Sequence, residues 1–183
     1  MSAWTFDPAH SGVEFAVKHM MVTTVRGSFR KFTVDVDFDE RQPEKSSVVA
    51  HIDASSIDTG VEARDAHLRS ADFLEAEKYP ELTFRSTGIE KKGDEYWING
   101  DLTIRGETRP VALEAEIGGV VPNLQGGRRA AFSASTKISR KNWGLTWNVA
   151  LESGGFLVSD EIRISLDVAV VQVADVPEAA AAH

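Results

Sequence analysis

The feature that most constrains this chain is a strict alternation of apolar and polar side chains over short stretches. In residues 32–39 the apolar members occupy every second position, at Phe32, Val34, Val36 and Phe38. The positions between them are threonine and aspartate. Successive side chains of a β-strand point to opposite faces, so this stretch predicts a strand with one buried and one solvated side.

Stretches of this kind fill most of the chain. We expect strands at residues 12–18, 29–39, 47–55, 81–86, 96–104, 111–117, 132–138 and 161–173. Turn signals at short spacing between them indicate antiparallel neighbours. A sheet with one apolar side must cover that side, and an antiparallel barrel of about eight strands does so while leaving room for roughly one ligand. The first functional hypothesis is therefore a binding pocket.

Two segments break the alternation. Residues 57–70 predict a helix, with start signals at Asp58 or Thr59. It lies between the third and fourth expected strands, and Tyr79-Pro80 ends any helix there, because a residue before proline avoids helical backbone angles. Residues 139–159 predict a long irregular loop before the last strand. We expect one domain over residues 1–173 and a flexible tail over 174–183.

Composition excludes several function classes. The net charge of −8 over 183 residues opposes both nucleic-acid binding and electrostatic attachment to an anionic membrane. The chain has no cysteine, which excludes disulfides, thiolate nucleophiles and thiolate metal sites. No helical metal-binding spacing occurs among its histidines either, so no metal or catalytic residue is predicted.

The termini predict a location. Residues 1–7 lack the basic segment and the following apolar segment of a secretory signal peptide. The sequence also has no run of about 18 apolar residues that could span a membrane. We therefore expect a cytoplasmic protein without a membrane span. Exposed strand edges would also permit a homodimer.

Histidine and serine suggest two sites to weigh. His19 continues the alternation of Phe15 and Val17, so it would point inward at a pocket mouth or be hydrogen-bonded within the barrel wall. Asp7, His10 and Ser11 supply the residue types of a hydrolytic triad. They are neighbours in one turn, however, and side chains bonding the turn backbone explain them more simply.

The densest polar cluster is residues 64–70. One interpretation is that Arg64 or Arg69 pairs with a strand carboxylate and fixes the helix to the barrel. The other is that the helix closes one end of the barrel and its polar residues meet the head group of a ligand. His67 lies in the same cluster.

Seven motifs in order resemble the YceI-like family of bacterial proteins. They are residues 4–11, 15–19, 27–29, 64–70, 71–73, 79–80 and 100–106, and the order of the set is more specific than any single motif. Asn142-Trp143-Gly144-Leu145 also matches the family's aromatic and glycine after a basic residue. The resemblance implies a lipocalin-like barrel that binds, stores or transports an apolar isoprenoid, such as a polyprenyl chain or an isoprenoid quinone, without catalysis.

Carried onto this chain, the resemblance implies an apolar wall and a polar end. The expected wall is Phe15, Val17, Phe32, Val34, Val36, Ile52, Phe84, Leu102, Leu113, Phe132 and Leu166. The expected head-group end is His19, Arg64, His67 and Trp143. Two alternatives stay open: an enzyme that uses His19 or His67 on a small apolar substrate, and an interaction protein whose barrel is filled by its own rings.

Overall fold

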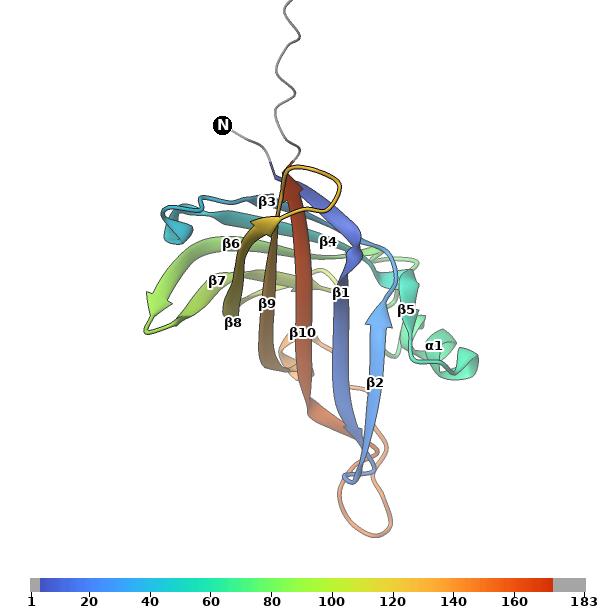
Figure 1. Ribbon diagram of the computed structural model, residues 1–183. Coiled ribbons are helices and arrows are strands. Elements are labelled where there is room, and N and C mark those ends of the chain that lie inside the picture. The colour runs from blue at the N-terminus through green and yellow to red at the C-terminus, as the bar shows by residue number, and fades with distance from the viewer. Residues whose placement is uncertain (1–3, 173–183) are drawn as a thin grey trace, which may run out of the picture.

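Residues 4–172 are described by a computed structural model, and their ten strands form one antiparallel sheet that curls into a half-barrel (Figure 1). The strands are β1 (Thr5–His19), β2 (Thr23–Phe29), β3 (Phe32–Asp37), β4 (Ser47–Asp53), β5 (Ile57–Asp58), β6 (Glu81–Lys92), β7 (Glu95–Ile104), β8 (Glu107–Pro122), β9 (Arg128–Ser139) and β10 (Val158–Gln172). Their spatial order is β3-β4-β6-β7-β8-β9-β10-β1-β2-β5.

The prediction of eight strands is wrong, because β2 covers residues where no strand was expected and one short strand lies where a helix was expected. The stretch 29–39 breaks at Arg30 and Lys31, between the end of β2 and the start of β3. Ile57 and Asp58 form β5 and pair with the end of β2. Two backbone hydrogen bonds, from Arg30 N to Ser56 O (3.1 Å) and from Asp53 N to Lys31 O (2.9 Å), join the break between β2 and β3 to residues 53–56.

The four helical segments are short. They are the α-helix α1 (Glu62–Arg69) and the single turns η1 (Pro43–Lys45), η2 (Ala54–Ser56) and η3 (Arg140–Trp143). α1 is shorter than the predicted helix, because β5 takes its first residues and Thr59 instead donates its backbone N–H to the Asp65 carboxylate (2.8 Å). None of the helices within residues 4–172 is long and apolar enough to cross a bilayer.

The inner face of the sheet carries the core. Along β3, Val34 is 3% exposed whereas its neighbours Thr33 and Asp35 lie in solvent. The same alternation buries Val13, Phe84 and Leu113 from strands β1, β6 and β8. The predicted tail, residues 174–183, lies outside the described residues.

The expected turn at residues 7–12 is a bulge within β1. Asp7 is paired with Ala169 but Gly12 with Asp167, so the intervening residues of β1 are extra. The Ser11 hydroxyl donates to the Asp7 carbonyl (2.7 Å) and accepts from Ala169 N (2.9 Å). Asp7 also contacts His10 Nδ1 (2.8 Å). The serine thus bonds the backbone, and no bond between Ser11 and His10 occurs in the described part of the chain.

The Asp7 carboxylate in this bulge makes the free energy of unfolding depend on pH. The hydrogen bond with His10, aided by Ala9 N and the charge of Arg129, holds the pKa of Asp7 below its ordinary value although partial burial opposes this. The stabilisation is therefore complete above an ordinary aspartate pKa of about 4 and is lost as pH falls through the lowered native value. The difference in free energy of unfolding between wild type and Asp7→Asn should shrink from pH 7 to pH 2.5 in denaturant titrations. A difference that stays constant over this range would contradict the assignment.

Candidate functional site

The curled sheet encloses two apolar chambers. The narrow chamber, of about 90 Å³, is bounded by side chains such as Val34, Val36 and Phe132. The wide chamber, of about 160 Å³, includes Phe15, Ile52 and others. A single buried water needs only about 10–15 Å³ of such space. Apolar residues dominate both linings, so the space suits hydrocarbon better than water.

The chambers adjoin each other. Ala50, Phe84, Leu113 and Leu166 border both of them. These four residues come from the paired strands β4 and β6 and from strands β8 and β10. The two chambers therefore form one continuous apolar interior, and we call the four residues at their shared border the waist.

A third cavity, of about 140 Å³, forms the mouth of the wide chamber. It shares Phe15, Val17, Leu68, Phe73 and Val158 with that chamber. Beyond these, the mouth gains nitrogen-bearing side chains and a ring, namely Lys18, His19, Arg64, His67 and Trp147. Polar side chains are therefore concentrated at this end of the wide chamber.

The structure brings most of the predicted site residues together. Val34, Val36 and Phe132 border the narrow chamber, Phe84, Leu113 and Leu166 the waist, Phe15, Val17, Ile52 and Leu102 the wide chamber, and His19, Arg64 and His67 the mouth.

Two predicted residues lie elsewhere. Phe32 packs against Phe6, with ring centroids 5.6 Å apart, and borders a shallow outer groove. Trp143 is 2% exposed and its indole N–H donates to the Leu102 carbonyl (3.0 Å). It therefore belongs to the wall behind the chamber, and Trp147, four residues later, lies at the mouth in its place.

Arg64 is held rigidly at the mouth. Its Nε donates to the Thr59 hydroxyl (2.7 Å) and its Nη2 to the Thr59 carbonyl (2.8 Å). The buried Asp65 carboxylate in turn accepts from the Thr59 hydroxyl (2.5 Å). Within residues 4–172 no carboxylate forms an ion pair with Arg64, and Arg69 pairs with Glu62 of its own helix. The expected ion pair to a strand carboxylate is therefore wrong for both arginines.

His67 is the second ordered group of the mouth. Its Nε2 lies 2.8 Å from a carboxylate oxygen of Asp72. Its ring meets the rings of Trp147 and Phe73 edge to face, at centroid distances of 4.7 and 5.0 Å. His19 projects into the same cavity from the end of β1, as its alternation predicted. Among residues 4–172, no group of three potential ligand side chains is placed to hold a metal ion.

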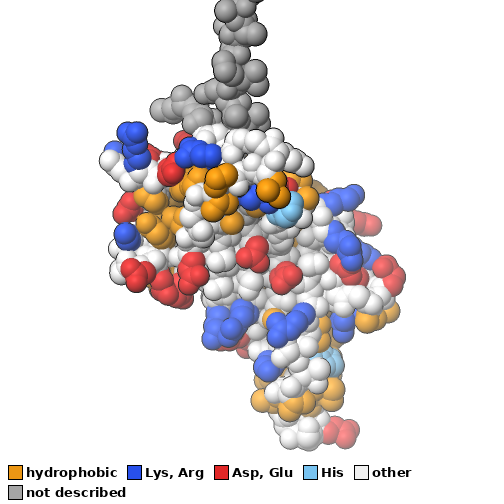
Figure 2. Space-filling model, in the orientation of Figure 1, with side chains coloured by type: hydrophobic (Ala, Val, Ile, Leu, Met, Phe, Trp, Pro, Cys, Tyr) orange, Lys and Arg blue, Asp and Glu red, His pale blue; other side chains and the backbone are white. Residues whose placement is uncertain are grey.

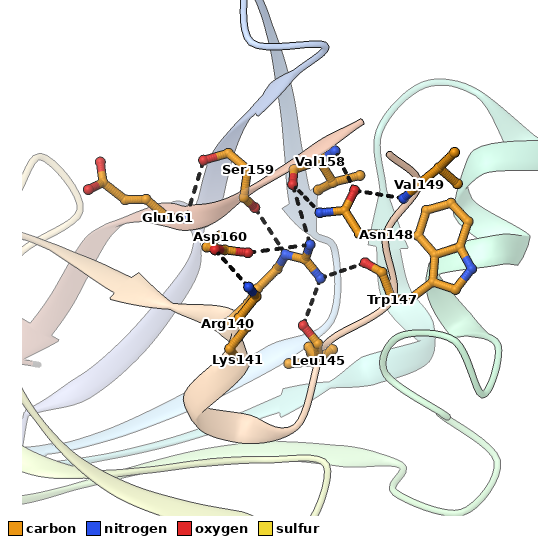
Figure 3. A network of polar contacts seen from close by, with 10 residues as sticks. All are labelled: Arg140, Lys141, Leu145, Trp147, Asn148, Val149, Val158, Ser159, Asp160 and Glu161. Atoms are coloured by element: carbon orange, nitrogen blue, oxygen red, sulfur yellow. Dashed lines mark hydrogen bonds and ion pairs between the residues drawn. The ribbon is translucent and has the colours of Figure 1, made fainter. Parts of the chain in front are cut away.

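Arg140 was not predicted as a site residue, and it organises the loop that leads to the mouth (Figure 3). Its guanidinium, 1% exposed, donates to the carbonyls of Leu145 (2.7 Å), Trp147 (2.9 Å) and Ser159 (3.0 Å). Burial lowers the pKa of Arg140, and the nearby Asp160 carboxylate opposes that shift. The only sequence signal was a basic residue shortly before Trp143 and Gly144. The arginine therefore sets the path of residues 144–159 and with it the position of Trp147.

Comparison with known proteins agrees with this architecture. The YceI-like domain family matches residues 4–170. The chain belongs to the YceI-like family. Protein YceI of Escherichia coli O157:H7 is 40% identical over 163 residues, which cover 89% of this chain and 82% of that protein.

Solved structures show the same fold. The Campylobacter jejuni YCEI protein is 32% identical, with a TM-score of 0.74 and coverage of 94% of this chain and 99% of that one. BcnA of Burkholderia cenocepacia is 27% identical, with a TM-score of 0.75 and coverage of 90% and 98%. A polyisoprenoid binding domain from Saccharophagus degradans shares the fold at 13% identity, with a TM-score of 0.65 and coverage of 94% and 99%.

The Arg140 network predicts a local stability defect. Arg140→Met keeps an unbranched apolar stem but removes the guanidinium and leaves three carbonyls without their donor, so we expect a loss of about 3 kcal/mol in free energy of unfolding. Lys141→Met, at the exposed neighbour, should change it by less than about 1 kcal/mol. Denaturant titration measures both. Equal losses in the two variants would contradict the role given to Arg140.

Proposed function

We propose that the protein binds an apolar isoprenoid lipid reversibly and without chemical change, with the chain in the chambers and the head group at the mouth. The observation that carries this proposal is the continuity of a long apolar interior with a polar opening at one end. The polyisoprenoid binding domain from Saccharophagus degradans, which has the same fold, supports this class of ligand.

The shape of the interior favours a long, thin ligand. Two chambers that meet at the waist suit a linear chain, which can extend from one into the other, better than a compact molecule. Each buried methylene contributes about 0.8 kcal/mol. Affinity should therefore grow with chain length until both chambers are filled.

The mouth favours a head group rich in acceptor oxygens. Arg64, His19 and His67 can all donate hydrogen bonds there, and no carboxylate borders the cavity. Quinone carbonyls and phosphate oxygens both meet this requirement. No serine borders the mouth either, so the lining gives the histidines no hydroxyl nucleophile to activate. We therefore favour binding over the enzymatic alternative.

The waist supplies a test of the proposal. Ala50→Phe places a ring where the chambers meet, so we expect a long polyprenyl ligand to lose at least about tenfold in affinity, equivalent to about two buried methylenes. A short prenyl ligand that fills only the wide chamber should bind nearly as before. Quenching of tryptophan fluorescence measures both dissociation constants.

The matched control for this test is Ala131→Phe, on the exposed face of β9. It should leave both affinities unchanged. Retained thermal transitions would show that each variant is folded. The proposal fails if wild type binds no polyprenyl ligand, or if Ala50→Phe weakens short and long ligands equally.

Arg64 supplies a test of the head-group assignment. In Arg64→Gln the fixed guanidinium is lost, so a prenyl lipid with an oxygen-rich head group should bind about tenfold more weakly, the equivalent of one charge-assisted hydrogen bond. A hydrocarbon of the same chain length should bind as it does to wild type. Equal weakening of both ligands would show that Arg64 acts through structure and does not contact the head group.

A further inference from the structure

Exposed apolar side chains gather at one end of the molecule. Met20, Met21 and Val22, in the turn between β1 and β2, are 50%, 66% and 80% exposed. Val149 and Phe156, in the loop before β10, are 46% and 56% exposed. We call these five residues the apolar tip. Figures 1 and 2 show this turn and loop projecting beyond the sheet, with orange side chains at the foot of the molecule.

Backbone hydrogen bonds hold the apolar tip together. Met20 N donates to the Leu157 carbonyl (2.8 Å), and Leu157 N donates to the Val149 carbonyl (2.9 Å). These bonds join the turn to the loop. Met20 and Met21 adopt left-handed backbone angles, φ 51° and 65°, which residues with large side chains rarely adopt. Both the strained backbone and the exposure of these apolar side chains cost free energy. An exposed apolar patch of this kind typically marks a contact surface.

A row of cations lies on the outer face just above the tip. The strand register places Lys137 opposite Arg163, Arg163 opposite Ala16, and Ala16 opposite Arg26. Lys18 lies two residues nearer the tip on β1, and all four cations are exposed. Figure 2 shows Lys and Arg side chains gathered at this level.

The acidic groups nearby neutralise this row only in part. Glu161 lies 3.9 Å from Lys137, while Asp160 is engaged with Lys141 (3.1 Å) and Arg140. Glu152 lies in the loop of the tip itself, and Glu14 lies two residues beyond Ala16 on the side away from the tip. Within the described residues, Lys18, Arg26 and Arg163 form no ion pair. The end of the molecule near the tip is therefore locally cationic, although the whole chain carries −8.

We propose that the apolar tip docks on an anionic lipid bilayer. The five apolar side chains would enter the interface, and the cation row would lie at the level of the lipid phosphates, an arrangement typical of peripheral membrane binding. Lys18, His19 and Leu157 border the mouth and flank the tip, so docking brings the mouth to the membrane surface. The idea that docking serves the exchange of a lipid between the mouth and the membrane rests on the proposed function. The docking itself does not.

The test uses vesicles of phosphatidylcholine with phosphatidylglycerol and without any isoprenoid. The full chain should co-sediment with them, and Met21→Asn with Val22→Asn should weaken binding at least about tenfold, because apolar burial drives insertion. Asparagine tolerates the left-handed backbone of Met21. The matched control is Val121→Asn with Leu124→Asn, two other exposed apolar residues near the turn between β8 and β9, which should bind as wild type does.

Charge is tested on the same vesicles. Arg26→Gln and Arg163→Gln should each weaken binding about fivefold, and Lys45→Gln, an exposed cation on η1, should not. Pure phosphatidylcholine vesicles should bind wild type more weakly than the mixed vesicles do.

Three outcomes would overturn the docking proposal. They are no binding of wild type, equal losses in tip and control variants, or a tip variant that lowers only the oligomer mass in solution, which would make the tip a contact between copies. Isoprenoid binding in detergent solution separates the two proposals. If a tip variant still binds isoprenoid but no longer binds vesicles, the proposed binding function stands. If wild type binds vesicles but no isoprenoid, the proposed function alone is refuted.

Discussion

The structure depends on one constraint: the sheet presents an apolar inner face that its own side chains do not completely fill. Alternation along each strand directs apolar residues such as Val34 and Leu113 inward, and the curl of the sheet brings them around a shared interior. The space left between them is continuous and apolar. Core cavities normally reduce stability, and the proposed ligand would complete this interior.

The polar end of this space is built by groups that fix backbone segments. Asp65 holds Thr59, which positions Arg64, and Arg140 gathers the carbonyls of the loop that carries Trp147. A charge with 1% exposure is stable there because several carbonyls surround it. The mouth is thus rigid where the proposed head group would bind, and the apolar tip extends from the same loop.

The sequence alone predicted the residues whose position follows from strand periodicity. Phe15, Val36 and Leu166 were correctly placed on the inner face, because a period of two fixes the side on which each side chain lies. The family resemblance added the mouth, where His19, Arg64 and His67 meet.

What the sequence could not predict depends on contacts between distant segments. The bend at Arg30 and Lys31 is joined to Ser56 and Asp53, and no local pattern encodes that pairing. Trp143 and Trp147 lie in an irregular segment, so periodicity could not tell which one reaches the mouth. The cation row exists only through the register of four strands, and the net charge of −8 concealed it.

The most direct test of the central claim is the lipid content of the protein itself. Protein purified from its native host, extracted with organic solvent and analysed by mass spectrometry, should yield an isoprenoid lipid in a ratio approaching one per chain. Ala50→Phe purified in the same way should yield less of it, or a shorter homologue. Extracts without isoprenoid, from protein that also fails to bind an added polyprenyl lipid, would contradict the account.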